Sequence, residues 1–309
     1  MILGFDTSNY TTSAAAVGSG GFFNVRRLLT VKEGQRGLRQ SDALFAHIKA
    51  LPELYHELCG QIPIGEIRAA GVSIKPRNVE GSYMPVFLAG KTFASAVADT
   101  AGVPLYSFSH QDGHIMAGIL SADCGELLER PFLSVHLSGG TTEILKTSYN
   151  GYCFDNEIVG KTLDISAGQL IDRIGVKMGL SFPCGKMMDS LSRQAKKGIK
   201  LPVSVKTSYI NFSGTETKAA FLLTKENQPE IALGIIEAVA KSLEAAVNAC
   251  IKSTGLSDIL MAGGVSSNTY LREYLQERVG GRIYFASPEL STDNAVGIAA
   301  LAARAYEKR

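Results

Sequence analysis

Two histidines, His110 and His114, stand four residues apart in the stretch SHQDGH that begins at Ser109. On a helical turn this spacing places both imidazoles on one face, about 5–6 Å apart. Two nitrogens arranged in this way can meet at one metal ion. The zinc-protease motif HExxH has the same spacing, but it needs a glutamate after the first histidine to act as general base. Gln111 holds that position here and cannot take a proton, so the sequence argues against a protease.

The helices and strands that must position this pair can be predicted from apolar runs and turn residues. Taken alone, the pair is equally typical of histidines that only cap or hydrogen-bond on a helix. The apolar residues 103–108 predict a strand, and it delivers His110 at its carboxyl end, where ligands bind in α/β sheets. A hairpin is predicted over residues 2–17 and a further strand over 68–74. Helices are predicted over residues 41–59, 86–101, 164–180, 229–254, 269–279 and 295–306.

Two predicted hairpins carry hydroxyl-rich connections. Residues 6–13 contain Asp6 among hydroxyls that could hold phosphate or water, although a surface turn is the favoured interpretation of this segment alone. Residues 132–145 repeat the outline, with a Ser-Gly-Gly-Thr-Thr turn between two apolar strands. The paired Gly139 and Gly140 let the backbone approach an anion, and neighbouring hydroxyls add donors. Strand alternation makes His136 point the same way as Ser138, which makes it a site candidate.

Two late segments have the form of ligand sites. Residues 262–268, AGGVSSN, follow an apolar strand and open a helix, an arrangement that receives phosphate or a nucleoside edge. The tripeptide Thr292-Asp293-Asn294, here called the TDN motif, precedes the last predicted helix. Read alone, Asp293 is explained by capping, a role worth about 1 kcal/mol.

Composition describes an ordinary globular chain of 309 residues, with 45% apolar and 19% charged residues. A net charge of +2 is too small for the whole protein to attract nucleic acid, so any surface that binds nucleic acid must be a local basic patch. Basic residues cluster at 22–40 and 193–206, both expected to be loops. The five scattered cysteines form no CxxC pair, which favours a reducing compartment. Because no basic leader and no apolar run of about 20 residues is found, a cytoplasmic protein without membrane contact is expected.

Taken in order, the two hairpins, the AGGVSSN segment and the TDN helix resemble the ASKHA proteins (actin, Hsp70 and sugar-kinase-like). This resemblance implies an α/β fold in which two related lobes hold a nucleotide between them. It implies an N-terminal lobe of residues 1–120, with the helix 294–309 packing back on it, and a C-terminal lobe of residues 121–293. The HxxGH and TDN motifs resemble, more narrowly, the TsaD and Kae1 family of tRNA threonylcarbamoyladenosine transferases. The resemblance covers most of the chain.

Carried over by position, the family's metal ligands are His110, His114 and Asp293. Some family members place a tyrosine ligand where this chain has His136, so a third imidazole is expected. Mixed nitrogen and oxygen ligation fits one divalent metal, zinc or iron.

The resemblance also implies an adenine nucleotide, as ATP, ADP or threonylcarbamoyl-AMP. Asp6 and Ser138 are the expected catalytic residues. The implied contacts to phosphate, ribose or adenine are Leu137, Ser138, Gly139, Gly140, Thr141, Asp172, Gly185 and Asn268. The implied activity is transfer of threonylcarbamoyl from its adenylate to N6 of an adenosine beside the tRNA anticodon. Expected partners are tRNA, contacted by the two basic clusters, and TsaB-like and TsaE-like proteins or a second copy of the chain.

Several positions depart from the family pattern. A Gly-Pro-Gly loop is replaced by Lys75-Pro76-Arg77, and the SGG loop ends in Thr141 rather than His or Asn. A family glutamate is Gln169 here, and a family glycine is Cys184. These changes favour a diverged paralogue, for which two alternatives stay open: a carbamoyltransferase with another acceptor, and a non-catalytic partner subunit. A sugar- or acetate-type kinase is disfavoured, because such enzymes use magnesium and do not need the histidine pair.

Overall fold

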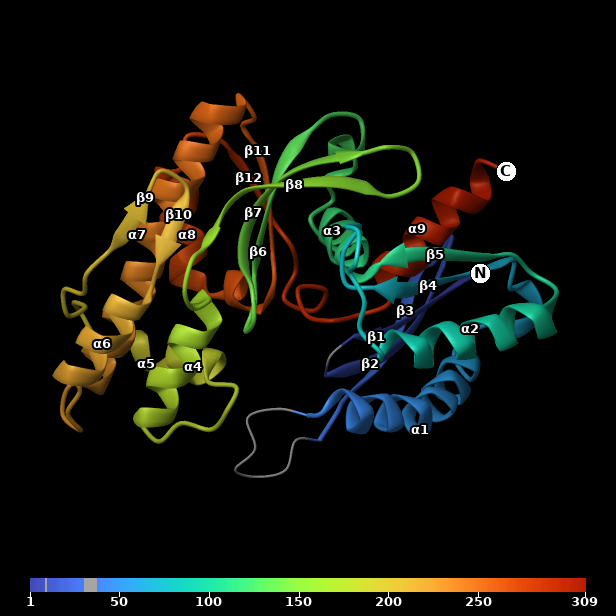
Figure 1. The fold of residues 1–309 in the computed structure, drawn as a ribbon, viewed down its shortest axis with the longest axis horizontal. Helices are drawn as coiled ribbons and strands as arrows, with labels where there is room; N and C mark the ends of the chain where they lie inside the picture. The colour runs from blue at the N-terminus through green and yellow to red at the C-terminus, as the bar shows by residue number, and fades with distance from the viewer. Residues whose placement is uncertain (9, 31–37) are drawn as a thin grey trace. The chain divides into compact units, whose positions relative to one another are not determined.

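A computed structural model describes residues 1–8, 10–30 and 38–309, which divide into two compact units (Figure 1). Unit 1 consists of Met1–Asp123, Tyr149–Asp155 and Thr292–Arg309, and unit 2 of Cys124–Ser148 and Asn156–Ser291. The division into folding lobes at residues 120 and 293 remains a prediction. No helix in the described ranges has both the length and the apolar character that crossing a membrane requires.

Unit 1 is built on a five-stranded sheet with the order β3-β2-β1-β4-β5. Strands β1 to β3 form an antiparallel meander, whereas β1, β4 and β5 are parallel. The carboxyl ends of these parallel strands therefore share one edge, with β4 in the middle. The strands are β1 (Ile2–Ser8), β2 (Thr11–Gly18), β3 (Gly21–Leu28), β4 (Ala69–Lys75) and β5 (Leu105–Ser109).

Helices cover both faces of this sheet (Figure 1). Helices α1 (Gln40–Cys59) and α2 (Phe87–Ala101) share an apolar core with one face. Helix α9 (Val296–Glu307) lies on the other face, and α3 (His110–Ser121) packs on α9. Two positions in the strands are glycine because α9 and the residue before it pack directly on the strand backbone there. A Cβ on Gly4 would lie 2.4 Å from the Ala295 carbonyl oxygen, and one on Gly71 would lie 2.8 Å from the Cβ of Ala302.

Unit 2 contains a seven-stranded sheet with the order β12-β11-β6-β7-β8-β10-β9. Its core joins the sheet to α4, α7 and α8, and Leu133, Val135 and Leu137 all belong to it, as strand alternation predicts. The strands are β6 (Phe132–Leu137), β7 (Thr142–Tyr149), β8 (Phe154–Thr162), β9 (Ser204–Lys206), β10 (Tyr209–Asn211), β11 (Asp258–Ala262) and β12 (Arg282–Phe285). The helices are α4 (Ala167–Lys177), α5 (Gly185–Ser192), α6 (Ser213–Leu222), α7 (Gln228–Thr254) and α8 (Thr269–Arg278), with short 3₁₀ turns at Ile64–Glu66, Gly125–Leu128 and Gly264–Ser267.

Three local predictions need correction. The segment 22–40, expected to be a basic loop, forms β3 up to Leu28, and its residues 31–37 lie outside the described ranges. Helix α1 begins at Gln40, one residue before its predicted start, so Ser41 does not cap it, and its N-cap Arg39 makes no capping side-chain bond. Helix α4 begins at Ala167 rather than at residue 164. The Ser166 hydroxyl accepts a hydrogen bond from the Gln169 N–H and so fixes the start of the helix.

Candidate functional site

The hydroxyl-rich connection of the first hairpin is buried strand, and the favoured interpretation as a surface turn is wrong. Asp6, Thr7, Thr12 and Ser13 are fully buried, because the β1–β2 ladder continues through them and pairs Thr7 with Thr12. Their hydroxyls are used inside the unit. Thr7 Oγ1 donates to the Val86 carbonyl at 2.9 Å, for example. The strand ladder thereby carries Asp6 into the interior of unit 1 rather than to solvent.

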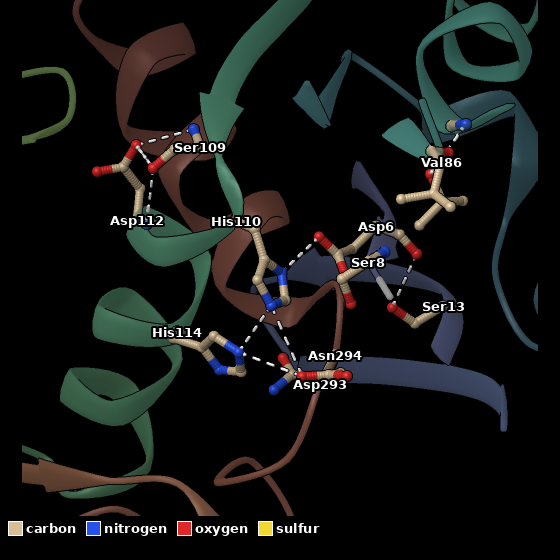
Figure 2. Close-up of polar contacts among 12 residues, drawn as sticks. Asp6, Ser8, Ser13, Val86, Ser109, His110, Asp112, His114, Asp293 and Asn294 are labelled. Atoms are coloured by element: carbon tan, nitrogen blue, oxygen red, sulfur yellow. Dashed lines mark hydrogen bonds and ion pairs between the residues drawn. The ribbon is translucent and has the colours of Figure 1, made fainter. Parts of the chain in front are cut away.

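The first turn of α3 holds the two histidines side by side. Ser109 and Asp112 form a capping box that starts the helix at His110. The spacing of four residues then brings the rings of His110 and His114 to a centroid distance of 4.3 Å, with the two Nε2 atoms 2.9 Å apart (Figure 2). The predicted helical geometry of the pair is present.

Asp293 joins this pair from the segment that precedes α9. Its Oδ1 lies 3.3 Å from His114 Nε2 and 3.6 Å from His110 Nε2. One ligand atom from each of the three residues falls within 4.8 Å of the others. Capping does not explain Asp293, because Asn294 Oδ1 accepts the bond from the Val296 N–H at 3.0 Å.

Asp6 supports the group from β1. Its Oδ1 lies 2.9 Å from His110 Nδ1 (Figure 2). A carboxylate on the far nitrogen of a histidine is the usual second partner of a metal-binding imidazole, because it fixes the tautomer and the ring orientation. Burial lowers the pKa of His110, but the carboxylates of Asp6 and Asp293 raise it to about 10. Burial raises the pKa of Asp293, but hydrogen bonds from His110 and His114 hold it well below its usual value.

The donor set fits a divalent metal. When His110 donates its Nδ1–H to Asp6, the neutral ring turns a lone pair at Nε2 toward His114 Nε2 and the Asp293 carboxylate. These groups repel one another unless a proton or a cation stands among them. Two imidazole nitrogens and one carboxylate oxygen suit zinc or iron, with positions left for water or substrate.

The SGG turn between β6 and β7 is closed by two hydrogen bonds between Ser138 and Thr141. Ser138 N–H donates to the Thr141 carbonyl at 2.8 Å, and Thr141 N–H donates to Ser138 Oγ at 3.1 Å. Nothing lies within 4 Å of a Cβ built on Gly139 or Gly140, so there is open space beside both glycines. A ligand can therefore approach the backbone here without meeting a side chain.

Two further glycines lack a side chain where other elements pack closely against this turn. A Cβ on Gly168, in the first turn of α4, would lie 2.4 Å from the Ser138 carbonyl oxygen. A Cβ on Gly263 would lie 2.2 Å from the Leu137 carbonyl oxygen. The turn therefore sits at the N-terminus of α4, where backbone N–H groups and the helix dipole favour an anion. Neither of these two contacts could be found from the sequence pattern.

Asp172, Gly185 and Asn268 are linked through α5 in the same unit. Asp172 Oδ1 accepts from the Cys184 N–H at 2.7 Å, immediately before Gly185 begins the helix. One turn further, Asp189 Oδ1 accepts from Asn268 Nδ2 at 2.6 Å. Asn268 Oδ1 also caps α8 by accepting the Leu271 N–H, so both ends of this amide are engaged within the protein. The roles of the three residues toward a nucleotide remain predictions.

His136 lies on β6, in unit 2, half-buried and opposite Glu143 of β7. Its assignment as a metal ligand remains a prediction. The residue that sequence reasoning missed is Asp112, and the Ser-x-x-Asp spacing of a capping box was the signal that could have found it.

Solved structures define the class of fold. The chain is similar to the activator of the 2-hydroxyisocaproyl-CoA dehydratase from Clostridium difficile, with a TM-score of 0.56, 15% identity and coverage of 99% of this chain and 94% of the other. It is also similar to a ROK family glucokinase from Streptomyces griseus, with a TM-score of 0.54, 13% identity and coverage of 98% and 99%. The predicted α/β two-lobed ASKHA fold is confirmed.

Sequence comparison narrows the class to one family. The family model described as TsaD, tRNA N6-adenosine threonylcarbamoyltransferase, matches residues 30–300. A relative of that name from Thermus thermophilus is 31% identical over 314 residues, which cover 99% of this chain and 93% of the relative. The chain belongs to the TsaD family, as its motifs predict.

Proposed function

We propose that the chain is a metal-dependent transferase that modifies tRNA. The substrate pair is threonylcarbamoyl-AMP and an adenosine next to the anticodon. The observation that carries this proposal is the convergence of His110, His114 and Asp293 within 4.8 Å, in a chain whose relatives are named for this transfer. In the reaction the bond between the carbamoyl carbon and the phosphate oxygen breaks, and a bond to N6 forms. AMP leaves, and N6 gives up one proton.

Unit 1 supplies the metal-binding part of this chemistry. His110, His114 and Asp293 would hold one zinc or iron ion, which when bound supplies a Lewis acid for the acyl carbonyl. Asp6 keeps the His110 ring in place by accepting its Nδ1–H. Because Asp6 is fully buried, water does not compete for that bond.

Unit 2 supplies the phosphate-binding part. The space at the Cβ positions of Gly139 and Gly140 is open, and the N–H groups of this turn would donate to the phosphate of the adenylate. The start of α4 adds a favourable dipole for that negative charge. Leu137, Ser138 and Thr141 shape the turn, and Asp172, Gly185 and Asn268 would bind the ribose and adenine.

A different acceptor is the second candidate, and one observation favours it. Strand β4 ends in Lys75, followed by Pro76 and Arg77, and this strand lies between β1, which carries Asp6, and β5, which leads into His110. Two cations at the end of the strand between them, where the family has glycines, would suit an acidic small acceptor. TsaB-like and TsaE-like proteins, or a second copy of the chain, would assist the tRNA reaction.

Metal content and transfer activity test the function together. Purified wild type is expected to hold about one zinc or iron per chain and to convert tRNA to the threonylcarbamoylated form when given threonylcarbamoyl-AMP and the partner proteins. The double variant His110→Ala/His114→Ala should lose both properties. His56→Ala, an exposed histidine on α1, is the matched control and should keep them. Wild type free of metal after metal-replete preparation would refute the metal site, and metal without transfer would favour another acceptor or a non-catalytic subunit.

A further inference from the structure

A second carboxylate, Asp112, is fully buried in the first turn of α3, next to the proposed metal group of His110, His114 and Asp293 in sequence but not part of it. Its Oδ2 accepts from the Ser109 N–H at 2.9 Å, from Ser109 Oγ at 2.7 Å and from Asn78 Nδ2 at 2.7 Å. Its Oδ1 accepts from the Phe154 N–H at 3.1 Å. A buried carboxylate is tolerated only when donors surround it, and Asp112 has four of them.

These four donors belong to three separate segments of unit 1. Ser109 ends β5 and caps α3, Asn78 lies in the loop after β4, and Phe154 lies in the segment Tyr149–Asp155. The loop after β4 makes a further bond to the same helix, from the Gln111 N–H to the Pro76 carbonyl at 3.0 Å. Through Asp112, helix α3 is therefore bonded to two distant segments of the chain, at Asn78, 34 residues before it, and at Phe154, 42 residues after it.

Asp112 shares the first turn of α3 with His110 and lies on the other side of the helix from the histidines. With 3.6 residues per turn, a residue two positions on is rotated by about 200°. Figure 2 shows Asp112 turned toward Ser109, while the imidazoles face Asp6 and Asp293. The same helical turn therefore holds the metal ligands on one side and the two segments on the other.

We propose that Asp112 is a positioning residue that couples metal binding to the order of the loop at Asn78 and of the segment at Phe154. This inference rests on the proposed metal site. Metal binding fixes His110 and His114, and with them the first turn of α3. Asp112 then offers its carboxylate at a fixed place to both segments. The coupling is reciprocal, so the ordered segments strengthen metal binding by the same free energy that metal binding adds to their order.

Asp112→Asn tests this coupling. The new amide nitrogen cannot accept, so it must face the N–H of Phe154 or the donors of Ser109 and Asn78. Asp164→Asn is the matched control. Asp164 likewise accepts hydrogen bonds from several segments, in its case three backbone N–H bonds from Ile165, Phe212 and Ser213, but it lies in unit 2. Asn78→Leu removes one arm of the contact and leaves Asp112 with its other donors.

Two readouts are measured on the full chain with Zn²⁺ or Co²⁺ alone as the probe. The first is metal affinity, together with the absorption spectrum of the Co²⁺-loaded protein. The second is hydrogen exchange of the peptide containing Phe154, with and without metal. We expect Asp112→Asn to bind metal about 5–150-fold more weakly, the usual range for the coupling between two sites. Asn78→Leu should have a smaller effect, and Asp164→Asn none.

In wild type and in Asp164→Asn, metal should slow exchange at the Phe154 amide, and in Asp112→Asn it should not. A merely structural role for Asp112 would lower stability without making this exchange independent of metal. Wild-type metal affinity and an unchanged Co²⁺ spectrum in Asp112→Asn would overturn the coupling while leaving the proposed function intact. Metal-dependent protection of Phe154 in a protein that never modifies tRNA would support the coupling and refute the function. Absence of metal binding in wild type would refute both.

Discussion

At the scale of single residues, we expect the charge of Asp6 to strengthen metal binding at the proposed site, because its Oδ1 lies 2.9 Å from His110 Nδ1. In Asp6→Asn the amide oxygen still accepts the Nδ1–H of His110, but the negative charge that steadies this ring is lost. We expect metal affinity about tenfold below wild type with the fold retained. Competition with a chromophoric chelator measures this directly. Equal chelator competition in the two proteins would show that the Asp6 charge does not act on the ligands.

The sequence could predict the histidine pair because helical spacing is a local property. It could not predict that Asp6 is buried, since hydroxyl-rich segments more often form surface turns, and here the β1–β2 ladder overrides that preference. Asp112 was missed for a related reason. Two of its donors, Asn78 and Phe154, come from segments that only tertiary structure brings to α3.

At the scale of elements, the start of α4 against the SGG turn depends on the absence of a side chain at Gly168. In Gly168→Ala, the new Cβ would lie 2.4 Å from the Ser138 carbonyl and 2.5 Å from Gly139 Cα, so the turn must move. We expect adenine-nucleotide binding to weaken at least about tenfold, a cost of roughly 1.4 kcal/mol. Isothermal titration with ADP measures it. Gly214→Ala on α6 is the control: it has open space and should gain helix stability without losing nucleotide.

The segment between β8 and α4 is held by Asp164, and its contribution to stability depends on pH. Burial raises the pKa of Asp164, but the N–H groups of Phe212 and Ser213 lower it below the usual value. Its stabilisation is therefore present above the unfolded pKa of about 3.9 and is lost as pH falls through the lower folded pKa. Asp164→Asn should melt at a lower temperature than wild type at pH 7. The difference should shrink below about pH 4, and a constant difference across thermal melts would contradict this assignment.

Most elements were predictable from apolar runs and the residues that end them, as in α2 and α7, which end at Gly102 and Gly255 and whose predicted and observed bounds nearly coincide. Prediction failed where a local cue was ambiguous. Strand β3 was expected to be a loop, because its basic residues and glycines are typical of loops, whereas its register is set by pairing with β2. The contacts of Gly168 and Gly263 with the SGG turn belong to the same class, since they arise from packing between elements distant in sequence.

At the scale of the whole molecule, the net charge of only +2 means that binding of RNA would depend on a local basic surface. The segment between α5 and β9 is the strongest candidate, because Lys196, Lys197 and Lys200 are all exposed on it. Each lysine that contacts a phosphate releases counterions on binding. The plot of the logarithm of the binding constant against the logarithm of the salt concentration therefore becomes steeper by about one unit of slope per contact. The triple variant K196A/K197A/K200A should therefore bind tRNA more weakly and with a salt slope shallower by up to about three.

The matched control for that measurement removes the same charge elsewhere. K91A/K225A/K252A changes three exposed lysines on α2, before α7 and at the end of α7. A uniform effect of net charge would weaken both triple variants equally, whereas a local contact surface weakens only the first. Equal slopes in the two variants would therefore assign tRNA binding to another part of the chain or to a partner protein. A loss confined to K196A/K197A/K200A, with metal and ADP binding unchanged, would separate recognition of the acceptor from the chemistry that we propose for His110, His114 and Asp293.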